Sequence, residues 1–209
     1  MNRVIKLLMI SDIFVITGFG LIEPILSIFI KENLIGGSVF AAGFASTLFL
    51  VTKSVVQLPF SKYVDSHKHK IRWLILGTLI ISAVPFIYIF AKDVKFIYLA
   101  QVLYGLGAGF AYPTWLGLWS THLDNNHESF EWSLYSTAAG LGTALTAAVG
   151  AAIAYLFGFA YTFAIVGVMS LVGAFILFKL EKEKELKKET KISHYHYHKK
   201  RKLVHLRHH

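Results

Sequence analysis

Three ionisable side chains lie inside long apolar runs of the 209-residue chain. Asp12 and Glu23 belong to the first run, and Lys53 belongs to the second. A charged group near the middle of a bilayer costs roughly 2.5–3.5 kcal/mol even on lenient scales, so it needs a partner, water or a function. With a helical rise of about 1.5 Å per residue, Lys53 lies at a depth between the two acids. We therefore expect Lys53 to pair with either acid, and a switch between them to be a transport step; the alternative is a static ion pair that sets helix register.

Glu23 is the strongest candidate for a carboxylate that responds to protons or cations, because Pro24 follows it. Proline lacks an amide hydrogen, which loosens the helix and leaves a carbonyl free for water or a solute. Asp12 is a weaker candidate, since its position also fits the level of the lipid headgroups.

The composition places the chain in a lipid bilayer. It is 55% hydrophobic and 16% charged, too apolar for one soluble core. A membrane-spanning helix needs roughly 20 mainly apolar residues, and six segments qualify: about 5–30, 39–61, 71–91, 94–119, 132–159 and 161–179. We predict an all-helical membrane protein with both termini on one side. No cysteine is present and no nucleophile, base and acid are arranged together, so we expect no enzyme activity, no cofactor and no cysteine-ligated metal. We expect no metal at the histidine-rich end either, where a metal-binding tail is the alternative.

Lysine and arginine gather at one end of these six segments. That end includes both termini and the turn after the second segment, whereas the other end carries only Lys31, Lys92 and Lys95. This asymmetry predicts cytoplasmic termini, with the plasma membrane as the expected location. Much of the net charge of +9 comes from the histidine- and lysine-rich segment 181–209. We interpret that segment as a cytoplasmic tail that extends the last helix and ends disordered or on anionic lipid, and we expect no nucleic-acid partner.

A short pattern occurs twice, 89 residues apart (107 − 18 = 89). Each copy has two glycines and a proline in the same spacing: Gly18, Gly20 and Pro24, then Gly107, Gly109 and Pro113. Each copy also lies in the first of three apolar segments, which predicts a three-helix unit used twice, over about 1–91 and 92–180. Tyr112 then takes the position that corresponds to Glu23. Small residues allow close helix contacts in lipid, and Gly142 and Gly150 predict such a contact for the fifth segment.

These features resemble one six-helix half of the major facilitator superfamily. The glycines and proline of the first segment are similar to its first helix, and the glycines that follow Gln101 and Tyr104 are similar to its fourth. Asp65 and the basic residues Lys68, Lys70 and Arg72 resemble its loop between helices 2 and 3. The resemblance implies a transporter of small solutes, with Gln101, Tyr104 and Tyr112 facing the cavity and the loop closing a gate. The loop aspartate would then meet a helix N-terminus of the opposite half; alternatively it only ends its helix and pairs with Arg72.

Superfamily transporters consist of two such halves, and this chain resembles one. We expect two copies to form a homodimer, because a single half would expose the polar groups of its cavity to lipid. A different half could instead complete the carrier. The alternative function is that of a non-transporting membrane scaffold whose cytoplasmic tail recruits a partner. Trp119 lies near the end of an apolar segment and is expected to anchor it at the membrane interface.

Overall fold

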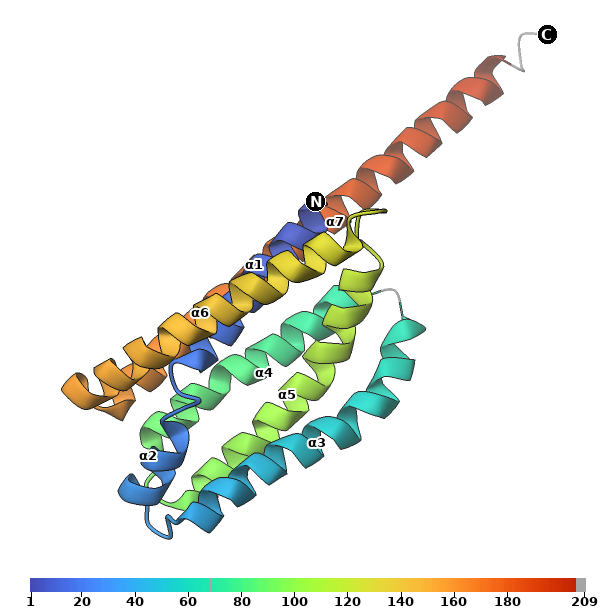
Figure 1. Cartoon of the computed structure of the whole chain (residues 1–209). Coiled ribbons are helices and arrows are strands. Elements are labelled where there is room, and N and C mark those ends of the chain that lie inside the picture. Colours follow the sequence, from blue (N-terminus) through green and yellow to red (C-terminus); the bar gives the residue numbers. More distant parts are fainter. Residues whose placement is uncertain (68, 206–209) are drawn as a thin grey trace.

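A bundle of long helices accounts for the fold of this chain. The computed structural model describes the backbone of residues 1–67 and 69–205 and the side chains of residues 1–67 and 69–182. The described residues form seven helices: α1 (Arg3–Gly20), α2 (Leu26–Asn33), α3 (Val39–Asp65), α4 (Lys70–Phe90), α5 (Val94–Ser120), α6 (Glu128–Phe157) and α7 (Phe159–His205) (Figure 1). Five of them, from α3 to α7, are long and apolar enough to cross a membrane, within the residues searched.

The first apolar segment differs from the expected single helix over 5–30. It is split into α1 and α2 by the turn at residues 21–25. Pro24 has no amide hydrogen to donate to the Gly20 carbonyl, and the chain tightens there, with the Leu21 amide donating to Gly18 and the Ile25 amide to Ile22. The prediction of one continuous first helix was therefore wrong.

The segment made of α1 and α2 nevertheless runs from one end of the bundle to the other. At its start, the ammonium group of Met1 lies 2.7 Å from the Asp124 carboxylate in the α5–α6 connection. At its end, the Ile35 amide donates to the Lys92 carbonyl over 3.0 Å, in the α4–α5 connection. The hydrogen bond from the ammonium holds the pKa of Asp124 below its ordinary value, in keeping with an ion pair at this end.

Helix pairs in the bundle meet where glycine or another small residue removes a side chain. The pairs in closest contact are α3 with α5, α4 with α5, α4 with α7, α1 with α7 and α1 with α6. A Cβ atom on Gly107 of α5 would lie 2.8 Å from the carbonyl oxygen of Gly77 on α4. On α6, a Cβ atom on Gly142 would overlap Thr17 and one on Gly150 would overlap the Leu21 carbonyl oxygen. These glycines bring the helix backbones into direct contact.

Two helices, α3 and α6, are left largely uncovered. Figure 1 shows them on opposite sides of the bundle, with α4 and α5 between them. Their exposed apolar side chains include Val55 and Leu58 on α3 and Leu141 and Leu145 on α6. The buried residues instead belong mainly to the contacts among α1, α4, α5 and α7.

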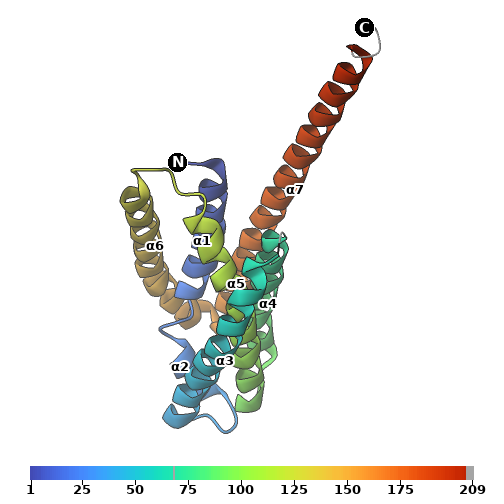
Figure 2. The same cartoon turned by 90° about the vertical axis from the view of Figure 1, so that its right-hand side faces the viewer.

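The last helix is longer than the apolar segment that it contains. The α7 backbone is helical to His205 and extends beyond the bundle (Figure 2). Residues 181–205 thus continue the helix, where the sequence predicts disorder for the second part of this segment. The histidine side chains of this segment lie outside the described residues.

Candidate functional site

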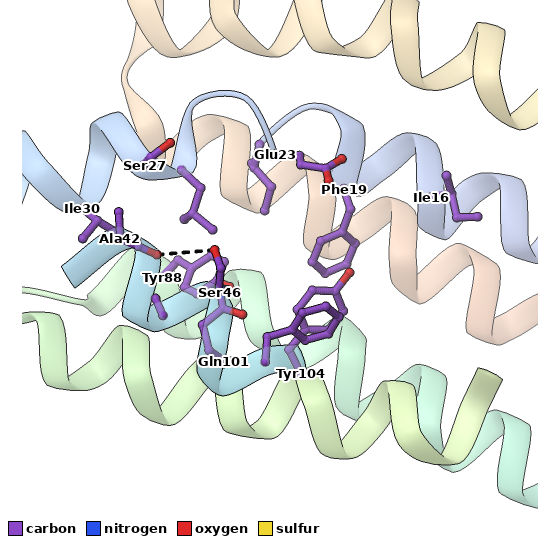
Figure 3. A pocket seen from close by; sticks show the side chains of 14 residues that line it. Ile16, Phe19, Glu23, Ser27, Ile30, Ala42, Ser46, Tyr88, Gln101 and Tyr104 are labelled. Carbon is purple, nitrogen blue, oxygen red and sulfur yellow. Dashed lines mark hydrogen bonds between the residues drawn. The ribbon is translucent and has the colours of Figure 1, made fainter. Parts of the chain in front are cut away.

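A cavity of about 340 Å³ opens beside the turn that separates α1 from α2. Glu23 lies in this turn, and its exposed side chain lines the cavity (Figure 3). We call this space the Glu23 cavity. Its walls come from α1, α2, α3, α4 and α5. The lining side chains that can form hydrogen bonds are those of Glu23, Ser27, Ser46, Tyr88, Gln101 and Tyr104.

The polar wall of the Glu23 cavity contains a buried amide and hydroxyl pair. Nε2 of Gln101 on α5 donates to the hydroxyl of Tyr88 on α4 over 3.2 Å, and both side chains are buried. This bond leaves the Gln101 carbonyl oxygen and the Tyr88 hydroxyl hydrogen free for further partners. Glu23 is the one ionisable carboxylate of the lining, so this cavity combines a single negative charge with neutral hydrogen-bonding groups.

A second cavity, of about 220 Å³, contains the other two ionisable groups of the apolar segments. We call it the Asp12 cavity; Asp12 and Lys53 both line it. The hydroxyl of Tyr135 on α6 donates to Asp12 Oδ2 over 2.5 Å. The Lys53 ammonium lies 4.4 Å from the centre of the Tyr112 ring. An aromatic face stabilises a cation by about 0.5–2 kcal/mol, depending on how much water surrounds it.

Three stacked aromatic rings lie where the two cavities meet. The Tyr104 ring on α5 stands between Phe19 on α1 and Phe49 on α3, with centroid distances of 4.7 and 4.3 Å. The planes of neighbouring rings differ by 16° and 24°. Tyr104 and Phe49 line both cavities, whereas Phe19 lines the Glu23 cavity.

Comparison with known proteins places this arrangement of helices and cavities in a family. The family model of the Major Facilitator Superfamily matches residues 8–208. The chain belongs to the major facilitator superfamily. It is therefore an integral, multi-pass membrane protein of a transporter family and not a member of an enzyme family.

This chain is similar to part of one curated relative and to part of several transporters of known structure. Multidrug resistance protein 2 of Bacillus subtilis (strain 168) is 29% identical over 113 residues, which cover 54% of this chain and 28% of that protein. The in meso crystal structure of the POT family transporter PepTSo matches with a TM-score of 0.76 and 17% identity, over 87% of this chain and 38% of that one. The crystal structure of an auto-inhibited POT family peptide transporter matches with a TM-score of 0.72 and 16% identity, over 87% and 37%. The two structures show the shared fold, and this chain spans less than two fifths of the length of each of these proteins.

In this superfamily member, the predicted site residues fall into two groups. Glu23, Gln101 and Tyr104 line the Glu23 cavity, and Asp12, Lys53 and Tyr112 line the Asp12 cavity, with Tyr104 shared. Among the described residues no carboxylate forms an ion pair with Lys53, so the expected pairing with Asp12 or Glu23 is absent from this structure. Lys53 contacts an aromatic ring instead.

Sequence reasoning missed four aromatic residues of the site. Phe19 and Phe49 hold Tyr104, Tyr88 accepts from Gln101, and Tyr135 donates to Asp12 across a separation of 123 residues. Each of them is one of many aromatic residues in an apolar helix. No local pattern distinguishes those that face the cavities, because helix rotation depends on tertiary packing.

The superfamily loop between α3 and α4 is held by two separate ion pairs. Lys70 Nζ lies 3.2 Å from Asp65 Oδ1, and Arg72 Nε donates to Glu181 Oε1 on α7 over 2.5 Å. Asp65 is the last residue of α3, as the alternative predicts, and it pairs with Lys70 where that alternative expected Arg72. Lys68 lies outside the described residues.

Trp119 is not the interfacial anchor that its position near a helix end predicts. It is fully buried and stacks on Trp115, with Trp132 and Tyr135 of α6 against both rings. The reason is that α6 covers this end of α5 in the folded bundle, which the sequence of α5 does not reveal.

Proposed function

We propose that this chain is a six-helix half of a transporter that moves a small solute across the membrane by alternating access. The observation that carries the proposal is the position of its charged groups: Asp12, Glu23 and Lys53 all line cavities between helices. Charged groups within apolar segments that face a cavity are typical of substrate and ion pathways. Membership of the superfamily supports the same activity.

The proposal includes the internal repeat of two three-helix units, 1–91 and 92–180. Contacts of the repeated glycines support it. Gly18 packs against α7 and Gly107 against α4, and their nearest neighbours are themselves 89 residues apart: Val166 and Gly77, Met169 and Ile80, Ser170 and Ile81. Gly20 packs against Thr143 and Thr146 of α6, and Gly109 packs against Lys53 and Val56 of α3. Equivalent glycines thus contact equivalent helices.

We propose that a second copy supplies the other half of the carrier. The charged groups that line the two cavities support this, because a single half would expose them to lipid. The outer faces of α3, which packs on α5, and of α6, which packs on α1, are exposed in the single chain. The two cavities lie along the same helices. A twofold pair about an axis along the membrane normal would cover both faces and enclose the charged groups.

Native mass spectrometry of the protein released from a lipid-like environment tests this assembly. We expect a species of twice the 23.5 kDa chain mass. The control is the same measurement on a variant with Leu58→Glu and Leu145→Glu, one change on each exposed face, which should shift the protein towards a single chain. A wild-type protein that remains a single chain would contradict the homodimer and would indicate a different partner half.

We further propose that the Glu23 carboxylate takes up the coupling proton or cation. Glu23 is the one carboxylate of its cavity, and the turn beside Pro24 breaks the helix where it lies. Unsatisfied carbonyls at such a break can coordinate a cation or water together with the carboxylate.

Replacing Glu23 by glutamine should abolish coupled transport. We expect gradient-driven uptake into proteoliposomes to fall at least about tenfold, since the neutral amide can neither bind a proton nor offset a cation, and about 1.4 kcal/mol corresponds to tenfold. Uptake is first measured for labelled amino acids, dipeptides, sugars and organic cations, and the solute taken up above protein-free vesicles is used for the variants.

The matched control for this experiment is Glu128→Gln, an exposed carboxylate in the first turn of α6 that lines none of the cavities described here. It should transport as the wild type does. Equal losses in both variants would argue against a coupling role for Glu23. Absence of uptake for every solute would favour the scaffold alternative, in which the chain recruits a partner without transport.

The proposed orientation has both termini in the cytoplasm of a plasma-membrane protein. The end of the bundle that carries Met1, the α3–α4 connection and the α5–α6 connection is rich in lysine and arginine. The opposite end carries few basic residues, which supports the positive end being cytoplasmic.

A further inference from the structure

The three stacked rings occupy the boundary between the two cavities of the chain. Tyr104 and Phe49 contribute to the walls of both spaces, and Phe19 contributes to one. Figure 3 shows the Phe19 and Tyr104 side chains next to each other, with Glu23 and Ser27 on the same side of the cavity as Phe19. Since the rings come from three different helices, they connect α1, α5 and α3 at one depth of the bundle.

The two cavities also lead towards different ends of the bundle. The Glu23 cavity shares Ser27, Ala42 and Ser46 with a third hollow, which reaches Lys31 and Glu32 at the end of α2. The Asp12 cavity instead extends towards the other end of the bundle, along the middle of α1 and the C-terminal half of α5. Its walls include Leu74 near the start of α4 and Leu177 of α7, at the end of the bundle where Met1 contacts Asp124.

The cavities differ in charge. The Glu23 cavity has a single carboxylate among neutral hydroxyl and amide groups, whereas the Asp12 cavity has one carboxylate and one ammonium. A group that carries a positive charge is therefore favoured near Glu23. The Asp12 cavity offers a partner for either sign, because Lys53 and Asp12 are not paired with each other.

We propose that Tyr104 is a barrier that divides the solute path into two binding stations, an outer one at Glu23 that selects cationic groups and an inner one at Asp12 and Lys53. This inference rests on the proposed transport function. It adds the path that the solute follows along the cavities of one chain. In the structure the barrier is closed, because Tyr104 fills the space between Phe19 and Phe49. A solute passes when the Tyr104 ring leaves the stack, which separates its contacts with Phe19 and Phe49 and its packing against both apolar core clusters.

Cysteine accessibility tests the barrier directly, since the chain contains no native cysteine. Ser46→Cys places a thiol in the Glu23 cavity, and Ala108→Cys places one in the Asp12 cavity. The probe is a membrane-impermeant, positively charged methanethiosulfonate reagent applied to one face of oriented vesicles. From the face at the α2–α3 connection, we expect rapid labelling of Ser46→Cys and slow labelling of Ala108→Cys.

Removing the ring should open the route between the stations. Tyr104→Ala should raise the labelling rate of Ala108→Cys from that face by at least about tenfold, because both stacking contacts are lost. Tyr104→Phe keeps the ring and should leave the rate unchanged. The matched control is Tyr98→Ala, since Tyr98 is an aromatic residue of the same helix that packs edge-on against Phe44, outside the stack.

The charge preference of the outer station is tested by comparing the cationic reagent with its anionic counterpart at Ser46→Cys. The ratio of the two rates, divided by the same ratio for free cysteine, should favour the cation by about threefold in a site that admits water. Glu23→Gln should bring this ratio to one and should leave the ratio at Ala108→Cys unchanged.

Two results would overturn the inference. If Tyr104→Ala leaves labelling of Ala108→Cys unchanged in a variant that keeps its native mass and helical content, Tyr104 is not a barrier. An equal rise for Tyr98→Ala would show general loosening of the bundle. The labelling experiment needs no transported solute, so it tests the barrier separately from transport. If Tyr104 blocks labelling but no solute is taken up in proteoliposomes, the result contradicts the transport function and leaves the barrier standing.

Discussion

Replacing Gly150 by valine is expected to separate α6 from α1. A Cβ atom at this position would overlap the backbone carbonyl oxygen of Leu21, and neither backbone can move aside as a flexible side chain would. Overpacking of a well-packed contact typically costs about 1–3 kcal/mol, and a clash with backbone lies at the upper end of that range. We expect a lower thermal unfolding temperature in detergent and less folded protein in the membrane.

Gly140 provides the matched control for this change. It lies on the same helix, and a Cβ atom there would have no heavy atom within 4 Å. Gly140→Val should leave the unfolding temperature close to that of the wild type, which removes helix propensity as an explanation, because both variants make the same substitution in the interior of α6. Equal destabilisation of the two variants would contradict a close contact between α1 and α6.

Replacing Lys53 by methionine should reduce transport by at least about tenfold and at the same time raise the stability of the protein. The ammonium lies within an apolar helix and contacts an aromatic face instead of a carboxylate, so its burial is only partly offset. Methionine keeps the length of the side chain and removes the charge. A gain in stability with a loss of activity is the expected result for a residue that is kept for function.

Lys62→Met is the control, because Lys62 is an exposed lysine in the last turn of the same helix. It should change neither solute uptake nor the unfolding temperature. Uptake is measured in proteoliposomes and stability by thermal unfolding of the same preparations. A lower unfolding temperature for Lys53→Met would contradict this interpretation and would support the alternative that Lys53 is a structural residue that sets the register of α3.

The broad architecture of this protein could be predicted from its sequence. Long apolar segments identify the five membrane-crossing helices from α3 to α7, because a helix needs a minimum apolar length to span the bilayer. The repeated glycines and the loop around Asp65 identify the family, which the match over residues 8–208 confirms. The break at Pro24 was marked by residue type, although the division into α1 and α2 was not predicted.

The sequence also predicts a depth for each ionisable residue from the constant rise of a helix, but the turn at residues 21–25 interrupts that rise before Glu23. Their partners were not accessible. Lys53 faces Tyr112 and Asp12 accepts from Tyr135, although charge alone favours an ion pair between Lys53 and an acid. Likewise, Trp119 is buried under α6 and Tyr104 is held between Phe19 and Phe49.

The sequence by itself therefore determined which long segments are apolar enough to span the membrane and which charged groups lie within them. The tertiary structure alone decided which side chains face each other. The physical reason is that hydropathy and helical rise act along the axis of each helix, whereas the rotation of a helix about its axis is set by contacts with its neighbours, here by glycines such as Gly107 and Gly150 that bring two backbones together.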